Sequence, residues 1–200
     1  MKEYVVKRVE GVPTEEDWEN ANIAEMNENY WTEFTYKCES FAKVLYNDEA
    51  IYVRMRSNEM PVVAKYTERF SPVCLDSCME FFFAPDLNKE DFFMNIEVNA
   101  LGAFTGGAGV KGKRVRCEAD EIEQFEIKPC LYEDGWGVSF KVPFDYIKKY
   151  AGECTDNMKG NFYKCGSETG HRHYGMWNMI KTEKPDFHRP EFFGNLIFEK

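Results

Sequence analysis

The sequence predicts an all-β chain that folds as an antiparallel β-sandwich, of the jelly-roll or immunoglobulin-like type, with one or two short helices. Two observations favour this fold class. Short segments in which apolar and polar residues alternate follow one another from residue 50 onward, and helical signals occur at only two places. Because neither an internal repeat nor a linker interrupts the chain, we expect a single domain over residues 1–200.

Two short segments have the capping residues of helices. In residues 14–21, Thr14 can cap the N-terminus and Asp17 occupies the third helical position. The second predicted helix covers residues 144–150, with Gly152 beyond it as a common helix-ending residue. We expect both helices to close ends of a β-rich core.

Alternation of side chains predicts the strands. They cover residues 50–56, 76–85, 92–99, 114–118, 124–128, 135–142, 160–165 and 195–199. The clearest, 92–99, places Met94, Ile96 and Val98 on a core face. The glycine-rich stretch 102–112 has no phosphate-binding spacing and is predicted to be a mobile surface loop.

Composition excludes several classes of partner. The formal net charge of −10 repels nucleic-acid phosphates and anionic lipid surfaces, so we expect neither nucleic acid nor membrane as a partner. The first thirteen residues lack a secretory apolar region, and seven cysteines, an odd and unevenly spaced set, suit a reducing compartment. These features favour a cytoplasmic location.

Polar residues line one face of the predicted sheet. They are Asn95, Glu97 and Asn99 on one strand, Glu80 on a second, and Arg54 and Arg56 on a third. Fixed amide, carboxylate and guanidinium groups can satisfy sugar hydroxyls, while aromatic rings cover the apolar face of a pyranose. The alternative is an ordinary solvated sheet face with cross-strand ion pairs.

Three other features could have chemical roles. Glu80 and Glu97 could form the acid/base pair of a glycoside hydrolase. His171, His173 and Cys165 could bind zinc, although their spacing matches no standard zinc pattern and surface histidines are the alternative. An aromatic segment from residue 174 to 195 is predicted to be a long ordered loop, which contains Trp177, Phe187, Phe192 and Phe193.

Seven short motifs in order resemble a known family over nearly the whole chain. They are Asp17-Trp-Glu-Asn-Ala21, Tyr46-Asn-Asp-Glu-Ala-Ile-Tyr52, Asp76-Ser-Cys-Met-Glu-Phe-Phe82, Asn95-Ile-Glu-Val-Asn-Ala-Leu-Gly102, Trp136 with Val142-Pro-Phe144, Gly160-Asn-Phe-Tyr163 and Phe187-His-Arg-Pro-Glu-Phe-Phe-Gly-Asn-Leu196. Together they resemble a carbohydrate-binding module family 9-like domain in its free-standing form.

The resemblance implies a DOMON-like β-sandwich that clamps a sugar between two tryptophans, with structural calcium nearby. The strand carboxylate of that site falls on Glu80 and the downstream aromatic on Phe187, with Trp177 as its neighbour. The position of the first tryptophan falls on Cys74, which offers no ring, and Tyr66 or Phe70 could replace it from the preceding loop.

The sequence therefore favours non-catalytic binding of a mono- or oligosaccharide, linked to carbohydrate catabolism. The expected contacts are Glu80, Glu97, Asn99, Arg54, Trp177, Phe187, Tyr66 and Arg172. A haem or redox module using Met176 and His173 is a second hypothesis, and a hydrolase using the two glutamates is a third. Calcium ligands, the identity of the sugar and the oligomeric state are not determined by the sequence.

Overall fold

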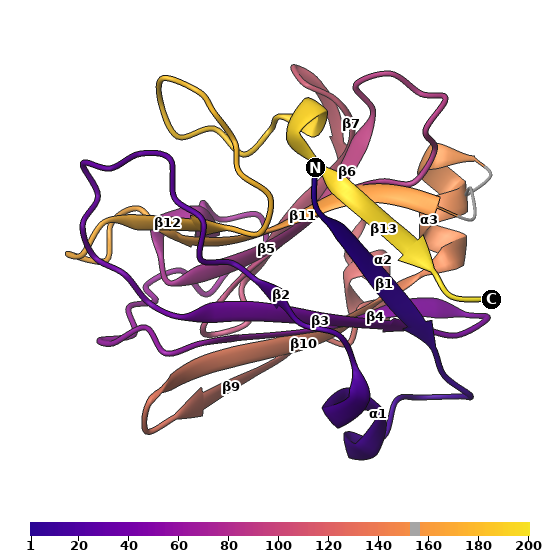
Figure 1. The fold of residues 1–200 in the computed structure, drawn as a ribbon, viewed down its shortest axis with the longest axis horizontal. Coiled ribbons are helices and arrows are strands. Elements are labelled where there is room, and N and C mark those ends of the chain that lie inside the picture. Colours follow the sequence, from indigo (N-terminus) through magenta and orange to yellow (C-terminus); the bar gives the residue numbers. More distant parts are fainter. Residues whose placement is uncertain (153–156) are drawn as a thin grey trace.

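A computed structural model describes residues 1–152 and 157–200, which form two packed β-sheets (Figure 1). Sheet A contains, in spatial order, β8 (Lys113–Arg116), β7 (Phe104–Val110), β6 (Phe93–Asn99), β5 (Cys78–Ala84), β11 (Asn157–Gly166), β13 (Gly194–Phe198) and β1 (Glu3–Arg8), with β12 (His173–Met176) also paired to β11. Sheet B continues from β1 through β3 (Ser40–Tyr46), β4 (Ala50–Ser57), β10 (Gly135–Pro143) and β9 (Lys128–Tyr132), with β2 (Ala24–Glu25) on β3.

Strand β1 joins the two sheets. Its first half pairs in parallel with β13, from Glu3 opposite Asn195 to Val6 opposite Phe198. Its last two residues pair in parallel with β3. The other ladders between the named strands are antiparallel, which agrees with the mostly antiparallel sandwich that the sequence predicts.

The core lies between the sheets and follows the predicted alternation. Met79, Phe81 and Phe83 of β5 face the same cluster as Ile96 of β6 and Val53 of β4. Each of these side chains is almost completely removed from water, and burying one large apolar side chain contributes about 1.5–3 kcal/mol. This core fixes which side of sheet A faces outward.

Three α-helices occur in the described residues, rather than one or two. They are α1 (Glu15–Asn20), α2 (Ala119–Gln124) and α3 (Phe144–Ala151), accompanied by the short 3-10 helices η1 (Val73–Leu75) and η2 (Pro190–Phe192). The predicted cap of α1 is confirmed, because Thr14 Oγ1 accepts from the Asp17 amide and the Asp17 carboxylate accepts from the Thr14 amide. Gly152 ends α3 with a φ of 81°, as expected. Among the described residues, no helix has the length and apolar character needed to cross a membrane.

The predicted loop over residues 174–195 begins instead within β12 and contains η2, and two other predicted segments are wrong. Residues 102–112 are not a mobile loop, since they contain β7, whose glycines allow the neighbouring backbones to approach closely. A Cβ on Gly106 would lie 2.5 Å from the Asn95 carbonyl oxygen, and one on Gly107 would lie 2.1 Å from that of Val115. The strand predicted at 124–128 is instead the end of α2 and the turn before β9.

Candidate functional site

The two glutamates predicted from the sequence lie side by side on the outer face of sheet A. Glu80 of β5 and Glu97 of β6 are direct partners across the antiparallel pair. Residues in this relation project from the same face with Cβ atoms about 4.5–5.5 Å apart. Both carboxyl groups therefore belong to one wall, with the hydrophobic core behind it.

This outer face is covered, so the alternative of an ordinary solvated face is wrong. Asn95, Glu97 and Asn99 are 4%, 6% and 0% exposed. A second hydrophobic cluster covers the sheet and includes Trp31, Tyr174, Ile180, Phe187 and Phe193, which come from loops as well as from β12. Alternation along β6 could not show that distant segments pass over its polar side.

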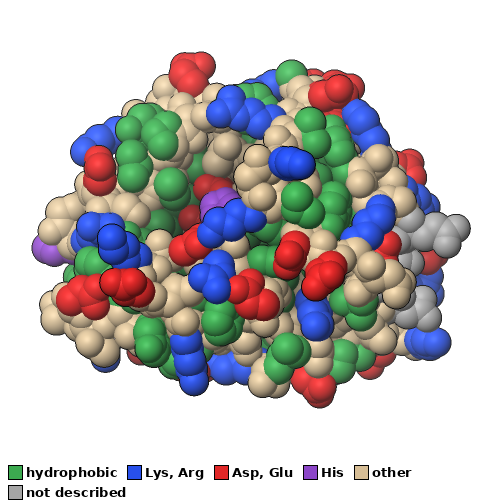
Figure 2. All heavy atoms as spheres, turned by 90° about the horizontal axis from the view of Figure 1, so that it is seen from above, with side chains coloured by type: hydrophobic (Ala, Val, Ile, Leu, Met, Phe, Trp, Pro, Cys, Tyr) green, Lys and Arg blue, Asp and Glu red, His purple; other side chains and the backbone are tan. Residues whose placement is uncertain are grey.

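A cavity of about 190 Å³ remains beneath this cover. Its walls are formed by Cys74, Glu80, Glu97, Cys165, Ser167, Tyr174, Pro185, Asp186, Phe187 and His188. From the side of the covering loop, Figure 2 shows a hollow near the centre of the surface with acidic and histidine side chains in it. Pockets for drug-sized ligands measure about 300–1,000 Å³, so this cavity has room for one small ring.

One wall of the cavity is aromatic. The rings of Phe187 and Tyr163 stack with centroids 4.1 Å apart and planes inclined by 5°. Tyr174 meets Phe187 edge-on at 6.0 Å, and Trp31 packs on Tyr174 at 5.6 Å. The Tyr174 hydroxyl is within 3.2 Å of Ser167 Oγ, so this wall also presents hydroxyl groups to the cavity.

The two carboxyl groups have few partners. No nitrogen or oxygen in the described part of the chain hydrogen-bonds to Glu80, whose neighbour is the Cys78 thiol. Glu97 Oε1 accepts from Asn95 Nδ2 at 2.7 Å. Burial, and then the charge of Glu97, raises the pKa of Glu80 well above its usual value, while burial raises the pKa of Glu97 to about 7.

The other titratable groups of the cavity are mostly neutral at pH 7. Burial raises the pKa of Cys74 to about 12 and that of Cys165 well above its ordinary value, so neither thiol is a thiolate nucleophile. Burial and the charge of Arg114 lower the pKa of His188. Asp186 is the exception, because its hydrogen bonds with Lys111 and the His188 amide outweigh partial burial and lower its pKa.

Three of the eight predicted contact residues line this cavity, namely Glu80, Glu97 and Phe187. Asn99 and Tyr66 have a structural role beside it. The Asp76 carboxylate accepts from Asn99 Nδ2 at 2.9 Å and from the Tyr66 amide at 3.0 Å, and Asn99 Oδ1 accepts from the amide of Ala103. These bonds hold the loop ahead of β5 in place.

The other three lie elsewhere. Trp177 is 4% exposed and packs between Tyr4 and Phe162 in the core, where it offers no stacking surface. Arg54 is on β4 of sheet B, pairs with Glu15 at 2.8 Å and does not share a face with Glu80. Arg172 is exposed, and its Nε donates to the Tyr174 hydroxyl at 2.9 Å, which links it to the cavity only indirectly.

Sequence reasoning missed Tyr174, Asp186 and His188, and it named Cys165 only as a zinc ligand. The strand alternation of β12 could have indicated Tyr174, since it is the Cα partner of Cys165. No local signal marks Asp186 and His188, because the path of the covering loop brings them to the cavity.

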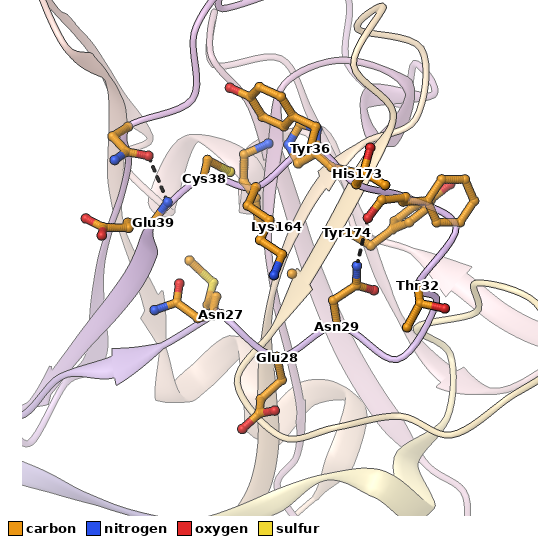
Figure 3. Close-up of a pocket in the computed structure, with 16 residues that line it drawn as sticks. Asn27, Glu28, Asn29, Thr32, Tyr36, Cys38, Glu39, Lys164, His173 and Tyr174 are labelled. Carbon is orange, nitrogen blue, oxygen red and sulfur yellow. Dashed lines mark hydrogen bonds between the residues drawn. The ribbon is translucent and has the colours of Figure 1, made fainter.

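A second, larger hollow of about 930 Å³ lies between residues 26–39 and the end of β11 with β12. Figure 3 shows Lys164 and His173 among polar side chains of the 27–39 segment. Lys164 Nζ lies 2.9 Å from Glu59 Oε2, which also accepts from Trp136 Nε1 at 2.9 Å. His173 Nε2 is 3.4 Å from Glu59 Oε1, and burial, then the charge of Lys164, lowers the pKa of His173 to about 4.

Ligand sets for the alternative cofactors do not assemble. His173 faces Glu59, whereas Cys165 points to the outer face of sheet A, so the suggested zinc ligands are separated. Across residues 1–152 and 157–200, no three His, Cys, Asp or Glu side chains gather as metal ligands, so a carboxylate site for calcium is not found there. Met176 Sδ accepts from the Ile180 amide, which occupies one suggested haem ligand.

The hydrolase hypothesis concerns how the two carboxyl groups are placed around a ligand. Catalytic carboxyls flank the scissile bond, typically about 5–9.5 Å apart. Glu80 and Glu97 instead stand on neighbouring strands of one wall, opposite the aromatic cover. They can hydrogen-bond one face of a ligand together.

Comparison with known proteins places this geometry in a family. The profile of carbohydrate-binding family 9 matches residues 10–198. No curated protein matches the chain. Among solved structures, a proposed carbohydrate-binding protein from Bacteroides uniformis is 25% identical, with a TM-score of 0.88 over 99% of both chains.

A family 9 carbohydrate-binding module from Caldicellulosiruptor kristjanssonii shares the fold at 16% identity. Its complex with glucose has a TM-score of 0.71 over 99% of this chain and 96% of that one. Its complex with cellotriose has the same TM-score over 99% and 94%. With the profile match over nearly its whole length, the chain belongs to carbohydrate-binding family 9.

Proposed function

We propose that the cavity formed by Glu80, Glu97, Tyr174, Phe187 and His188 binds a single sugar ring without catalysis. The observation that supports this best is the pair of buried carboxyl groups that share one wall of a 190 Å³ cavity opposite aromatic side chains. Carboxyl groups bind adjacent hydroxyls, and rings cover the apolar face of the sugar.

The cavity also explains how a site can persist without a tryptophan at position 74. Cys74 lines the cavity but has no ring, and neither Tyr66 nor Phe70 lines it. Tyr174 supplies aromatic surface from β12 instead. We expect a binding mode that differs from a clamp of two tryptophans.

Glucose and cellotriose, the ligands of the Caldicellulosiruptor module, are the first compounds to test. Isothermal titration should give a dissociation constant in the micromolar to millimolar range for at least one hexose. The Glu80→Ala variant should weaken it at least tenfold, whereas Arg54→Ala, remote on sheet B, should leave it within twofold. Absence of binding by every hexose tested at 50 mM would refute the proposal.

Further proposals rest on the family resemblance and on the composition and patterning of the sequence. They are that the sandwich is of the DOMON-like type, that residues 1–200 act as one domain, and that the protein serves carbohydrate catabolism in the cytoplasm. Superposition on DOMON domains and localisation of the tagged chain would test them.

A further inference from the structure

We propose that the sugar bound in this cavity has a protonated amine, so that the ligand is an amino sugar rather than a neutral one. This inference rests on the proposed function and specifies its ligand class. The reason is that, among the described residues, the cavity contains acidic groups without cations in contact with them.

Neither carboxyl group of the pair has a counter-ion in contact with it in the part of the chain that the structure describes. Among the residues that the structure describes, no Lys, Arg or His nitrogen lies within 4.0 Å of the carboxylate of Glu80 or Glu97. Glu80 is 2% exposed, lines the cavity and has no nitrogen or oxygen partner in these residues. An ionised carboxylate that is buried without a counter-ion lowers the stability of the folded protein, unless a ligand or a proton neutralises it.

The nearby cations make their hydrogen bonds and ion pairs with other groups, although the charges of Lys164 and Arg114 act at longer range on Glu80 and Glu97. Arg114 donates to Asn95 Oδ1 and to the carbonyl groups of Phe93 and Gly107. Lys164 projects from the opposite face of β11, where it binds Glu59. Lys111 pairs with Asp186 at the rim.

The remaining groups around the pair do not supply positive charge. Cys78 of β5, Tyr163 and Cys165 of β11 and Cys74 of η1 all have raised pKa values, so they stay neutral at pH 7. In the covering loop, His188 has a lowered pKa and is neutral, and Asp186 has a lowered pKa and is ionised. The cavity therefore favours a cation.

An ammonium group matches the cavity beside Glu80 and Glu97 better than a hydroxyl group or a metal ion does. It provides positive charge with three donors, and charge-assisted hydrogen bonds are roughly twice as strong as neutral ones. The acceptors available are both oxygens of Glu80 and the second oxygen of Glu97. A hard metal ion would need six or more oxygen ligands, and among the described residues no three His, Cys, Asp or Glu side chains are grouped closely enough to hold a metal ion.

The decisive measurement is titration of wild-type protein with three matched sugars at pH 6.5: glucosamine, glucose and N-acetylglucosamine. The same series is repeated with 6-amino-6-deoxyglucose, because the position of the amine is not specified. We expect at least one amino sugar to bind tenfold or more tightly than glucose, and N-acetylglucosamine to gain nothing. Equal affinity for amine and parent hexose would overturn the inference while leaving the proposed function intact.

Carboxamide variants locate the effect. Glu97→Gln and Glu80→Gln keep the shape of the side chain and should each reduce the preference for the amine at least fivefold, with native circular dichroism as the folding control. Arg54→Ala should keep the full preference. Retention of the wild-type preference by both Gln variants would overturn the inference.

Two measurements on wild-type protein need no variant. Because the pair is partly protonated when empty, binding of an amine near pH 7 should release protons, which titration in buffers of different ionisation enthalpy detects. Binding of glucose should release fewer. Displacement of a bound amino sugar by millimolar calcium would identify an inorganic cation site and overturn the inference.

Discussion

Two buried acidic sites in this molecule lie on opposite faces of β11 and differ in how their charge is balanced. On the inner face, Glu59 contacts Lys164 and Trp136 Nε1, each at 2.9 Å. On the outer face, Glu80 and Glu97 face a cavity without a cation. At the first site a cation of the chain balances the charge, although Glu59 Oε1 and His173 Nε2 have no hydrogen-bond partner among the described residues. At the second, we propose that a ligand supplies the balance. The two sites are similarly buried, so the difference in charge balance is the reason to propose the outer one as the binding site.

The largest expected effect comes from unbalancing the inner site. Lys164→Met removes the charge that pairs with buried Glu59 and should lower the free energy of unfolding by about 3–5 kcal/mol. Removing the Lys164 charge should raise the pKa of His173 from about 4. The loss should therefore be greater at pH 8 than at pH 5.5, because protonated His173 can compensate Glu59 only at the lower pH. Urea denaturation measures both values. The double variant Glu59→Gln/Lys164→Met should recover most of the lost free energy of unfolding. A loss below about 1 kcal/mol in Lys164→Met alone would show that the two sites do not differ in this way.

The outer site should respond in the opposite direction. A carboxyl group with a raised pKa binds more protons in the folded than in the unfolded protein, so its contribution to stability falls as pH rises through the window from 4.5 to about 7 for Glu97. Glu97→Gln removes this penalty. Relative to wild type, the variant should be unchanged at pH 4.5 and more stable by about 2–3 kcal/mol at pH 8.

The difference between variant and wild type is the quantity to compare, because His173 acts in an overlapping window with the opposite sign. Its lowered pKa means that stability is lost as pH falls from 6.5 towards 4. This term cancels in the difference. A Glu97→Gln variant that is less stable than wild type at pH 8 would contradict the prediction.

A smaller effect is expected at the aromatic wall. Phe187→Leu keeps an apolar side chain but removes the ring that stacks on Tyr163. Sugar affinity should fall three- to tenfold, which corresponds to about 0.7–1.4 kcal/mol. Calorimetric titration measures the change, with thermal unfolding as the control for packing. Unchanged affinity would show that the carboxyl wall alone holds the sugar.

The smallest effect is expected on sheet B. Arg54→Ala removes an exposed ion pair with Glu15 and stacking on Trp18, so stability should change by less than about 1 kcal/mol and sugar affinity by less than twofold. A tenfold loss of sugar affinity would contradict this prediction and indicate that Arg54 takes part in binding.

The sequence was sufficient for features that depend on local periodicity. The inward faces of β4, β5 and β6 followed from alternation, and the same argument placed Glu80 and Glu97 on outward positions. Two strands were not predicted because they contain residues that are unusual in strands. In β7 the glycines allow close approach of the neighbouring backbones, and in β9 Pro129 is tolerated because the strand lies at an unpaired edge.

Features that depend on strand order or loop path could not be predicted in this way. Arg54 has the right alternation but belongs to the other sheet. Trp177 and Phe187 come from one aromatic segment, yet the chain directs Trp177 into the core and Phe187 to the cavity. Only the three-dimensional path separates a packing ring from a binding ring.

The parallel pairing of β1 with β13 has a consequence for how the molecule is made. Glu3 lies opposite Asn195, so the end of sheet A that leads into sheet B joins positions 192 residues apart. Pairings of such long sequence separation form slowly, because chain entropy is lost before the contacts compensate for it. During synthesis β1 therefore cannot pair with β13 until residues 194–198 have been made. Until then the edges of β11 and β1 that β13 will cover are unpaired and can pair with the wrong strands.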